Sequence, residues 1–265
     1  MNNKSINYKK IIDEQSFYHF KKAINPKKID EIKKKMILIM KQFTEIDSSL
    51  SLDKQLDHAF KNSCKYGTNL RSNIYKAISN LQEIYSLYNN KNVKKIISSL
   101  GIKSARQQGT ALFAMEPNEN KFLTDVHQDI RNNFCSMKAI NLWFPLSKGD
   151  VRSGGLGIFS GSHKLGPHKH KVSSKTGYIT IDKKETLSKF PLKKINKFEI
   201  GDIIIFSPFS FHFSLKNTSK NIRWTASMCI DDAANTPHFR NQFNPYERSE
   251  YVEMLSNEAL HNKKN

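Results

Sequence analysis

The sequence predicts a mainly β fold with flanking helices, in which an antiparallel sandwich or barrel carries a helical N-terminal region. Apolar residues recur at three- and four-residue spacing in several stretches of the first hundred residues, which is typical of helices with one buried face. After Gly101 the pattern changes to short apolar or alternating runs separated by Gly, Asn, Ser and Pro, as in antiparallel sheets. At 265 residues, the chain is expected to form one structural domain.

The N-terminal region, residues 1–104, is expected to pack on the barrel through three helices. The first has Asn25 as its N-cap and Pro26 at its first helical position. Its apolar face consists of Ile29, Ile32, Met36, Ile39, Met40 and Phe43, and its lysine-rich face should be solvated. Further helices are expected over residues 69–88 and 92–100, and Gly101 is a plausible end for the last one.

The core of the fold is expected over residues 105–235. Its strands are predicted at 110–115, 137–146, 157–159, 203–206 and 222–230. Residues 164–197 are charged and poorly periodic, so we expect a long lid-like insertion with one strand at 177–181. Residues 236–265 are expected to form a polar C-terminal extension.

Composition excludes several classes of protein. The sequence has no apolar run long enough to span a membrane and no apolar N-terminal leader, which predicts a cytoplasmic protein without membrane insertion. Cys64, Cys135 and Cys229 are scattered and predict neither disulfides nor a thiolate metal site. The net charge of +19 suits an anionic small-molecule substrate, but only seven of the 43 basic residues are arginine, so nucleic-acid binding is not expected. We expect a monomer or a homodimer.

Residues 124–129, Thr-Asp-Val-His-Gln-Asp, contain the first candidate for chemistry. In an extended strand His127 and Asp129 would project from one face while Gln128 turns away. Two histidines and one carboxylate on one face of an octahedral iron(II) leave three positions for co-substrate and oxygen, and His212 is the candidate for the second histidine. A histidine on an exposed loop is the alternative interpretation of this short motif.

Residues 209–214 and 222–230 contain the second candidate. Both runs alternate strictly, so His212 and Ser214 share a face in the first, and Arg223 and Thr225 share a face in the second. If residues 217–220 close a hairpin, Ser214 lies opposite Arg223 and His212 opposite Thr225. The buried guanidinium would then bind an incoming carboxylate, with a hydroxyl from Ser214. Pairing of Arg223 with an internal acid such as Asp202 is the alternative.

Taken in order, these motifs resemble the phytanoyl-CoA dioxygenase family of iron(II)/2-oxoglutarate oxygenases over roughly residues 105–235. The matching elements are His127-Gln128-Asp129, Trp143 with Pro145-Leu146, Gly154-Gly155-Leu156, Ser160-Gly161-Ser162-His163, Gly201-Asp202, and His212-x-Ser214-x-x-Asn217-x-Ser219 followed by Arg223. The resemblance implies a double-stranded β-helix, the jelly-roll or cupin-like barrel. It implies that His163 is structural.

The resemblance also implies a catalytic and metal-binding set of His127, Asp129 and His212, with Fe²⁺ as the metal and 2-oxoglutarate and O₂ as co-substrates. Arg223 and Ser214 would bind 2-oxoglutarate, and we expect Asn141 and Thr225 to contribute to that site. The expected function is hydroxylation of a small metabolite or a sugar- or carrier-linked biosynthetic intermediate, with release of succinate and CO₂. Epimerisation, cyclisation or desaturation by the same fold, and a non-catalytic binding module, are the alternatives. A three-histidine cupin site is disfavoured by Asp129 and Arg223.

Overall fold

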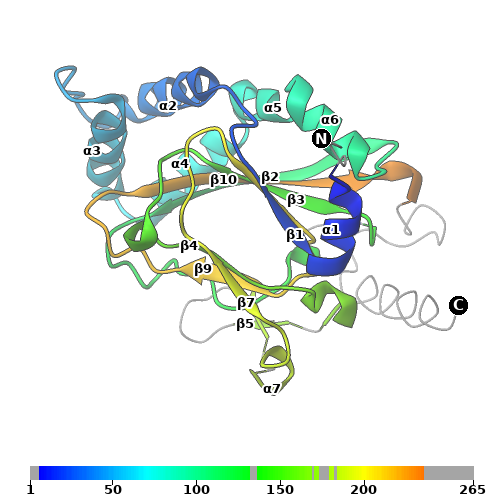
Figure 1. Cartoon of the computed structure of the whole chain (residues 1–265). Coiled ribbons are helices and arrows are strands. Elements are labelled where there is room, and N and C mark those ends of the chain that lie inside the picture. Colours follow the sequence, from blue (N-terminus) through cyan, green and yellow to red (C-terminus); the bar gives the residue numbers. More distant parts are fainter. Residues whose placement is uncertain (1–5, 132–135, 169, 173–178, 182–183, 236–265) are drawn as a thin grey trace, which may run out of the picture.

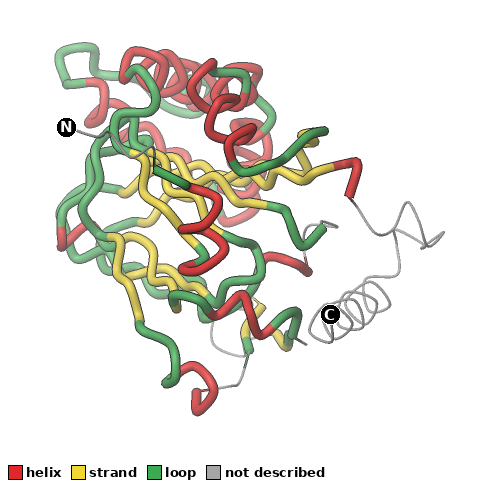
Figure 2. Tube along the Cα trace, turned by 45° about the vertical axis from the view of Figure 1, so that its right-hand side comes forward, coloured by secondary structure: helices red, strands yellow, loops and turns green. Residues whose placement is uncertain are grey.

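Two antiparallel sheets lie against each other, and a layer of helices covers the outer side of the larger one (Figures 1 and 2). The computed structural model describes residues 6–131, 136–168, 170–172, 179–181 and 184–235. The larger sheet has the order β1 (Phe17–Phe20), β8 (Ile203–Phe206), β3 (Ile140–Pro145), β10 (Arg223–Asp232) and β2 (Ala105–Met115). The smaller has the order β7 (Leu192–Ile195), β4 (Gly155–Phe159) and β9 (His212–Leu215). Mainly antiparallel sheets with flanking helices confirm the predicted fold class.

The helical layer consists of α2 (Pro26–Met40), α3 (Leu52–Cys64), α4 (Thr68–Ser79), α5 (Gln82–Tyr88) and α6 (Lys91–Ser99). As predicted, α2 begins at Pro26, and the Asn25 side chain accepts a hydrogen bond of 3.0 Å from the Lys27 amide. Its lysine-rich face is not wholly solvated, because Lys33 is only 1% exposed and its Nζ lies 2.7 Å from Asp53 Oδ1. A buried lysine needs such a partner, and α3 supplies it.

The single helix predicted over 69–88 is wrong, because the chain breaks between α4 and α5. The Asn80 side chain donates to the Lys76 carbonyl at 2.7 Å, so it replaces a backbone donor at the end of α4. Leu81 is then extended, with φ −63° and ψ 139°, before α5 begins. In the N-terminal region, three described elements were not predicted: α1 (Tyr8–Gln15), β1 and α3.

Strand β10 separates the helical core from the interior of the barrel. Trp224, Ala226 and Met228 are buried in one continuous core with α2, α3 and α4. Residues at the intervening positions, Arg223, Thr225 and Ser227, line a pocket between the sheets. This confirms the predicted alternation of faces.

The predicted hairpin between residues 212–214 and 223–225 is wrong. β9 pairs with β4 in the smaller sheet, whereas β10 pairs with β2 and β3 in the larger one. The connection between β9 and β10 therefore crosses from one sheet to the other (Figure 1). His212 and Arg223 face the same interior from opposite sheets instead of sharing a face.

The predicted insertion at 164–197 contains more regular structure than one strand. Leu192–Ile195 forms β7, which pairs with β4, and Lys184–Leu187 forms the short helix α7. β5 (Lys171–Val172) pairs with β6 (Ile179–Thr180). Of the predicted strand at 177–181, residues 179 and 180 form β6, residue 181 does not belong to a strand, and residues 177 and 178 lie outside the described residues. Cys135 and the predicted C-terminal extension, 236–265, lie outside the described residues. None of the described helices is long and apolar enough to cross a membrane.

Candidate metal centre

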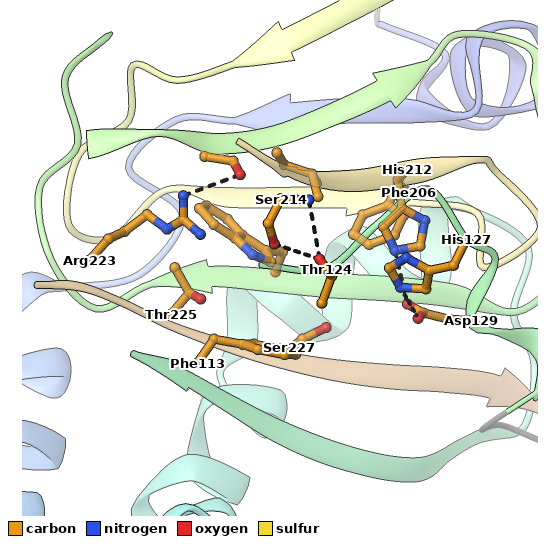
Figure 3. A pocket seen from close by; sticks show the side chains of 13 residues that line it. Phe113, Thr124, His127, Asp129, Phe206, His212, Ser214, Arg223, Thr225 and Ser227 are labelled. Carbon is orange, nitrogen blue, oxygen red and sulfur yellow. Dashed lines mark hydrogen bonds and ion pairs between the residues drawn. The ribbon is translucent and has the colours of Figure 1, made fainter. Parts of the chain in front are cut away.

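His127, Asp129 and His212 meet at one end of the pocket (Figure 3). One potential ligand atom from each residue lies within 4.8 Å of the others. The Nε2 atom of His127 lies 3.2 Å from one Asp129 carboxylate oxygen, and Nε2 of His212 lies 3.4 Å from the other. The three predicted residues therefore come together around one point.

Backbone hydrogen bonds hold the two parts of this cluster against each other. His127 and His212 form an antiparallel bridge in which each amide donates to the other carbonyl at 3.0 Å. The amide of Asp129 donates to the Pro208 carbonyl at 2.9 Å. Residues 127–129 do not form the extended strand predicted for them, because Asp129 already begins a 3-10 helix, Asp129–Arg131. The Asp129 carboxylate nevertheless reaches both imidazoles.

Both imidazoles are oriented by carbonyl groups behind them. Nδ1 of His127 lies 2.7 Å from the Asp125 carbonyl, and Nδ1 of His212 lies 2.9 Å from the Ser210 carbonyl. Since a carbonyl only accepts, each Nδ1 carries a proton, and Nε2 is the ring nitrogen that faces the cluster. This is the arrangement by which histidine ligands are usually oriented towards a metal.

The carboxylate of Asp129 is held as an anion. Burial alone would raise its pKa, but the neighbouring imidazoles of His212 and His127 hold the pKa well below its usual range. Asn141, on β3, donates from Nδ2 to Asp129 Oδ2 at 2.6 Å. Asn141 does not line the pocket, so its contact in this structure is with the carboxylate.

Arg223 lies at the other end of the pocket (Figure 3) and is 3% exposed. Its Nη1 donates to the carbonyls of Leu215 at 3.0 Å and of Ser153 and Gly155 at 3.3 Å. No acidic side chain among the described residues forms an ion pair with this guanidinium. Burial lowers the pKa of Arg223 to about 10, so it is still charged at neutral pH.

Asp202, the alternative partner for Arg223, lies elsewhere. It accepts hydrogen bonds from His19 at 2.9 Å and Lys21 at 3.1 Å, and also from the backbone amides of Lys22 and Glu199. The predicted alternative pairing is therefore wrong. Asp202 joins β1 to the turn before β8, and the buried charge of Arg223 faces the pocket.

The turn before β4 leaves room for this guanidinium. Gly154 has a φ of 74°, and a Cβ atom there would lie 2.3 Å from the Leu215 carbonyl oxygen and 2.7 Å from Arg223 Nη1. A side chain at this position would be strained and would displace the arginine. Gly154 therefore leaves the space that the Arg223 guanidinium occupies, and the Gly155 carbonyl accepts a hydrogen bond from it.

Hydroxyl groups lie between the two ends of the pocket. Ser214 Oγ lies 2.7 Å from Thr124 Oγ1, and the Ser214 amide donates to the Thr124 carbonyl and hydroxyl oxygens, each at 3.2 Å. Thr225 lines the pocket from β10, as predicted for a residue of this site. Sequence reasoning did not single out Thr124, because nothing in the sequence pairs it with Ser214, 90 residues later.

Aromatic and small side chains complete the pocket. Phe113 and Ser227 come from the larger sheet, and Leu156 comes from the smaller one. A set of two imidazoles and one carboxylate can bind a divalent metal and leave positions open, and a buried unpaired guanidinium can bind a carboxylate. The pocket thus contains three residues that can bind a divalent metal at one end and an arginine that can bind an anion at the other.

His163, expected to be structural, points away from this cluster to the protein backbone. Its Nε2 lies 3.1 Å from the Asp13 carbonyl, and burial lowers its pKa. Ser162, beside it, accepts a hydrogen bond from the Phe211 amide at 2.9 Å. The Ser160–His163 turn therefore ties α1 and residue 211 to the smaller sheet.

Comparison with known proteins gives one family match. The model of the family "Phytanoyl-CoA dioxygenase (PhyH)" matches residues 12–225. No curated protein sequence matches the chain.

Solved structures with the same fold are more distant in sequence. EctD from S. alaskensis, solved with 2-oxoglutarate and 5-hydroxyectoine, is 13% identical with a TM-score of 0.62, and the match covers 89% of this chain and 79% of that chain. The α-ketoglutarate-dependent carbocyclase SnoK from nogalamycin biosynthesis is 17% identical with a TM-score of 0.58, covering 87% of this chain and 85% of that chain. The epimerase SnoN, solved with Fe³⁺, α-ketoglutarate and nogalamycin RO, is 13% identical with a TM-score of 0.58, covering 85% and 82%. These likenesses confirm the predicted jelly roll.

Proposed function

Because this chain belongs to the phytanoyl-CoA dioxygenase family, we propose that it is an iron(II)- and 2-oxoglutarate-dependent oxygenase that hydroxylates a small molecule. The observation that carries the proposal is the convergence of His127, Asp129 and His212 at one end of a pocket whose other end holds Arg223. The iron and the co-substrate would lie in that pocket, each against the groups that suit its chemistry.

The three ligands would be Nε2 of His127, a carboxylate oxygen of Asp129 and Nε2 of His212. Nε2 is the nitrogen of each imidazole that faces the metal position, because each Nδ1 proton is bonded to a carbonyl. Asn141 was expected to contact the co-substrate; its bond to Asp129 supports a role in orienting the carboxylate instead. With the carboxylate present, three coordination positions stay open for co-substrate and oxygen.

Arg223 would bind the distal carboxylate of 2-oxoglutarate, and the Ser214 hydroxyl would donate to the same group. The buried guanidinium has only carbonyl partners among the described residues, so an incoming carboxylate would satisfy its charge. Thr124 would fix the rotamer of Ser214 through the bond between their hydroxyls. Thr225 would line the same part of the pocket.

Bound iron(II) supplies the coupled oxidation in which 2-oxoglutarate, O₂ and a substrate C–H group give succinate, CO₂ and a C–OH group. The protein holds the co-substrate between two fixed ends and keeps it in a buried pocket. Epimerisation or cyclisation is the second candidate outcome, which is supported by the reactions named for SnoN and SnoK. We expect a small-molecule substrate, and the net charge of +19 favours an anionic one.

The test is succinate formation by anaerobically purified protein that is given iron(II), 2-oxoglutarate and then O₂. We expect slow turnover without substrate, together with the visible charge-transfer band of an iron(II)–2-oxoglutarate complex. Arg223→Ala should weaken 2-oxoglutarate binding by at least about 30-fold, since losing one partner of a buried charge pair costs about 2 kcal/mol or more.

The matched control for Arg223→Ala is Arg152→Ala, which removes an exposed guanidinium paired with Asp150. The control should bind 2-oxoglutarate like the wild type. Absence of both turnover and the charge-transfer band in the wild type would contradict the oxygenase proposal. If the wild type does turn over 2-oxoglutarate, a metabolite screen followed by mass analysis of the products would distinguish hydroxylation, which adds one oxygen atom to the substrate, from epimerisation or cyclisation.

A further inference from the structure

Gln128, between two of the proposed ligands, points away from the pocket and is fully buried. Its Nε2 donates to the Gly166 carbonyl at 2.8 Å and to the Phe209 carbonyl at 2.6 Å. Its Oε1 accepts from the His168 amide at 2.9 Å. One side-chain amide thus bonds three backbone groups from two separate segments of the chain.

The backbone of Gln128 is bonded as well. Its amide donates to Nε2 of His170 at 2.9 Å, so Gly166, His168 and His170 are all bonded to residue 128, through its side chain or its main chain. The segment 208–212 is held to residues 127 and 129 by the backbone bonds that flank Gln128. Gln128 therefore lies at the junction of the three segments around the cluster.

A glutamine is the side chain that meets these demands. The two carbonyls can only accept and the His168 amide can only donate, so the site needs two donors and one acceptor at the end of a two-carbon stem. An ionised glutamate and a methionine have no donor, and a protonated glutamate has only one. Either change would leave buried backbone groups without a partner, which a protein interior tolerates poorly.

We propose that Gln128 is a positioning residue that sets the spacing of the three metal ligands. It contacts neither metal nor substrate; it fixes the backbone at residue 128, from which His127 and Asp129 project, relative to Phe209, three residues before His212. The inference rests on the proposed function, because it assigns Gln128 a role towards the metal of that site.

The test compares Gln128→Met with the wild type in a titration of the metal-free protein with cobalt(II), without 2-oxoglutarate. Cobalt(II) has visible absorption that depends on the arrangement of its ligands. We expect Gln128→Met to bind cobalt(II) about 10- to 100-fold more weakly, which is typical for loss of a group that orients ligands, and to show a shifted spectrum. In Gln128→Glu, burial favours the neutral carboxylic acid, which keeps one donor and the acceptor for His168. This variant should fall between the two, and it carries the test if the methionine variant does not fold.

Asn217→Leu is the matched control. Asn217 is also fully buried, and its side-chain amide donates to the Met115 and Asn221 carbonyls and accepts from the Ser219 amide, none of which belongs to a proposed metal ligand. The control should lose a similar amount of thermal stability yet bind cobalt(II) with the wild-type affinity and spectrum. A purely structural Gln128 would behave as the control does.

The outcomes separate the two proposals. If the wild type binds cobalt(II) and Asp129→Ala does not, the metal site stands; wild-type affinity and spectrum in the Gln128 variants would then overturn the positioning role. If the wild type itself binds no metal at His127, Asp129 and His212, the proposed function fails first.

Discussion

The two imidazoles of the cluster carry their protons on the nitrogens that face away from the pocket. The Asp125 and Ser210 carbonyls make this arrangement permanent, because neither can donate a hydrogen bond in return. A metal can therefore bind at Nε2 of each ring while Nδ1 keeps its proton and its carbonyl partner. The main electrostatic attraction comes from Asp129, the single anion of the set.

Metal binding should stabilise the fold through Asp129. Saturation at about 100 times the dissociation constant should add about 2.7 kcal/mol to the free energy of unfolding of the wild type. In Asp129→Ala this gain should disappear, because the anionic ligand is gone. Thermal melts with and without cobalt(II) or anaerobic iron(II) measure the difference, and an equal shift in the variant would exclude Asp129 as a ligand.

At the residue scale, the sequence allowed the ligand candidates to be found but not their geometry. His127 and Asp129 were paired on the premise of an extended strand, whereas Asp129 begins a 3-10 helix. The prediction still brought the right residues together, because the Asp129 carboxylate reaches both imidazoles from the start of this helix. Thr124 was missed, since a threonine becomes a site residue only through its long-range contact with Ser214.

At the level of elements, the sequence identified the strands but not which strands pair. β9 and β10 alternate as predicted, yet a four-residue turn between them does not close a hairpin because each pairs with strands distant in sequence. β1 was missed for a similar reason. It has only four residues and is a strand because it adds to the edge of the larger sheet beside β8.

Asp202 secures that edge pairing. Burial would raise its pKa, but hydrogen bonds from the Glu199 and Lys22 amides, together with His19 and Lys21, hold the pKa below the usual 3.8. Because the folded pKa is lowered, the stabilisation is complete above pH 3.8 and is lost as the pH falls through the folded pKa.

We therefore expect Asp202→Asn to lower the free energy of unfolding by about 2 kcal/mol at pH 7, the size of a hydrogen bond to a charged group. The gap between wild type and variant should narrow as the pH drops below 3.8. Urea unfolding at several pH values measures it. A gap that stays constant down to acid pH would show that the charge of Asp202 contributes nothing.

The whole molecule has two packed regions that share the larger sheet. The helical core contains Trp224, which contacts Phe60 of α3 with ring centroids 4.9 Å apart. The space between the sheets contains Trp143, which contacts Phe198 at 5.1 Å. Since β10 and β3, which carry these residues, are adjacent strands, the two regions should unfold together.

The chain has two tryptophans, so each region can be followed separately. Trp143→Phe leaves fluorescence from the helical core, and Trp224→Phe leaves fluorescence from the region between the sheets. Within each variant, the urea midpoint measured by fluorescence should equal the midpoint measured by circular dichroism. Distinct midpoints would contradict the predicted single structural domain and make the helical region a separate unit.

Because the two ends of the pocket lie on facing sheets, the pocket should select the length of the co-substrate. His212 belongs to the smaller sheet and Arg223 to the larger, so sheet packing, not a mobile loop, sets the span between them. Under the proposed function, this fixed span selects 2-oxo diacids by the number of methylene groups between their two carboxylates. Oxaloacetate, one methylene shorter than 2-oxoglutarate, would fall short of the guanidinium, and 2-oxoadipate, one longer, would have to buckle.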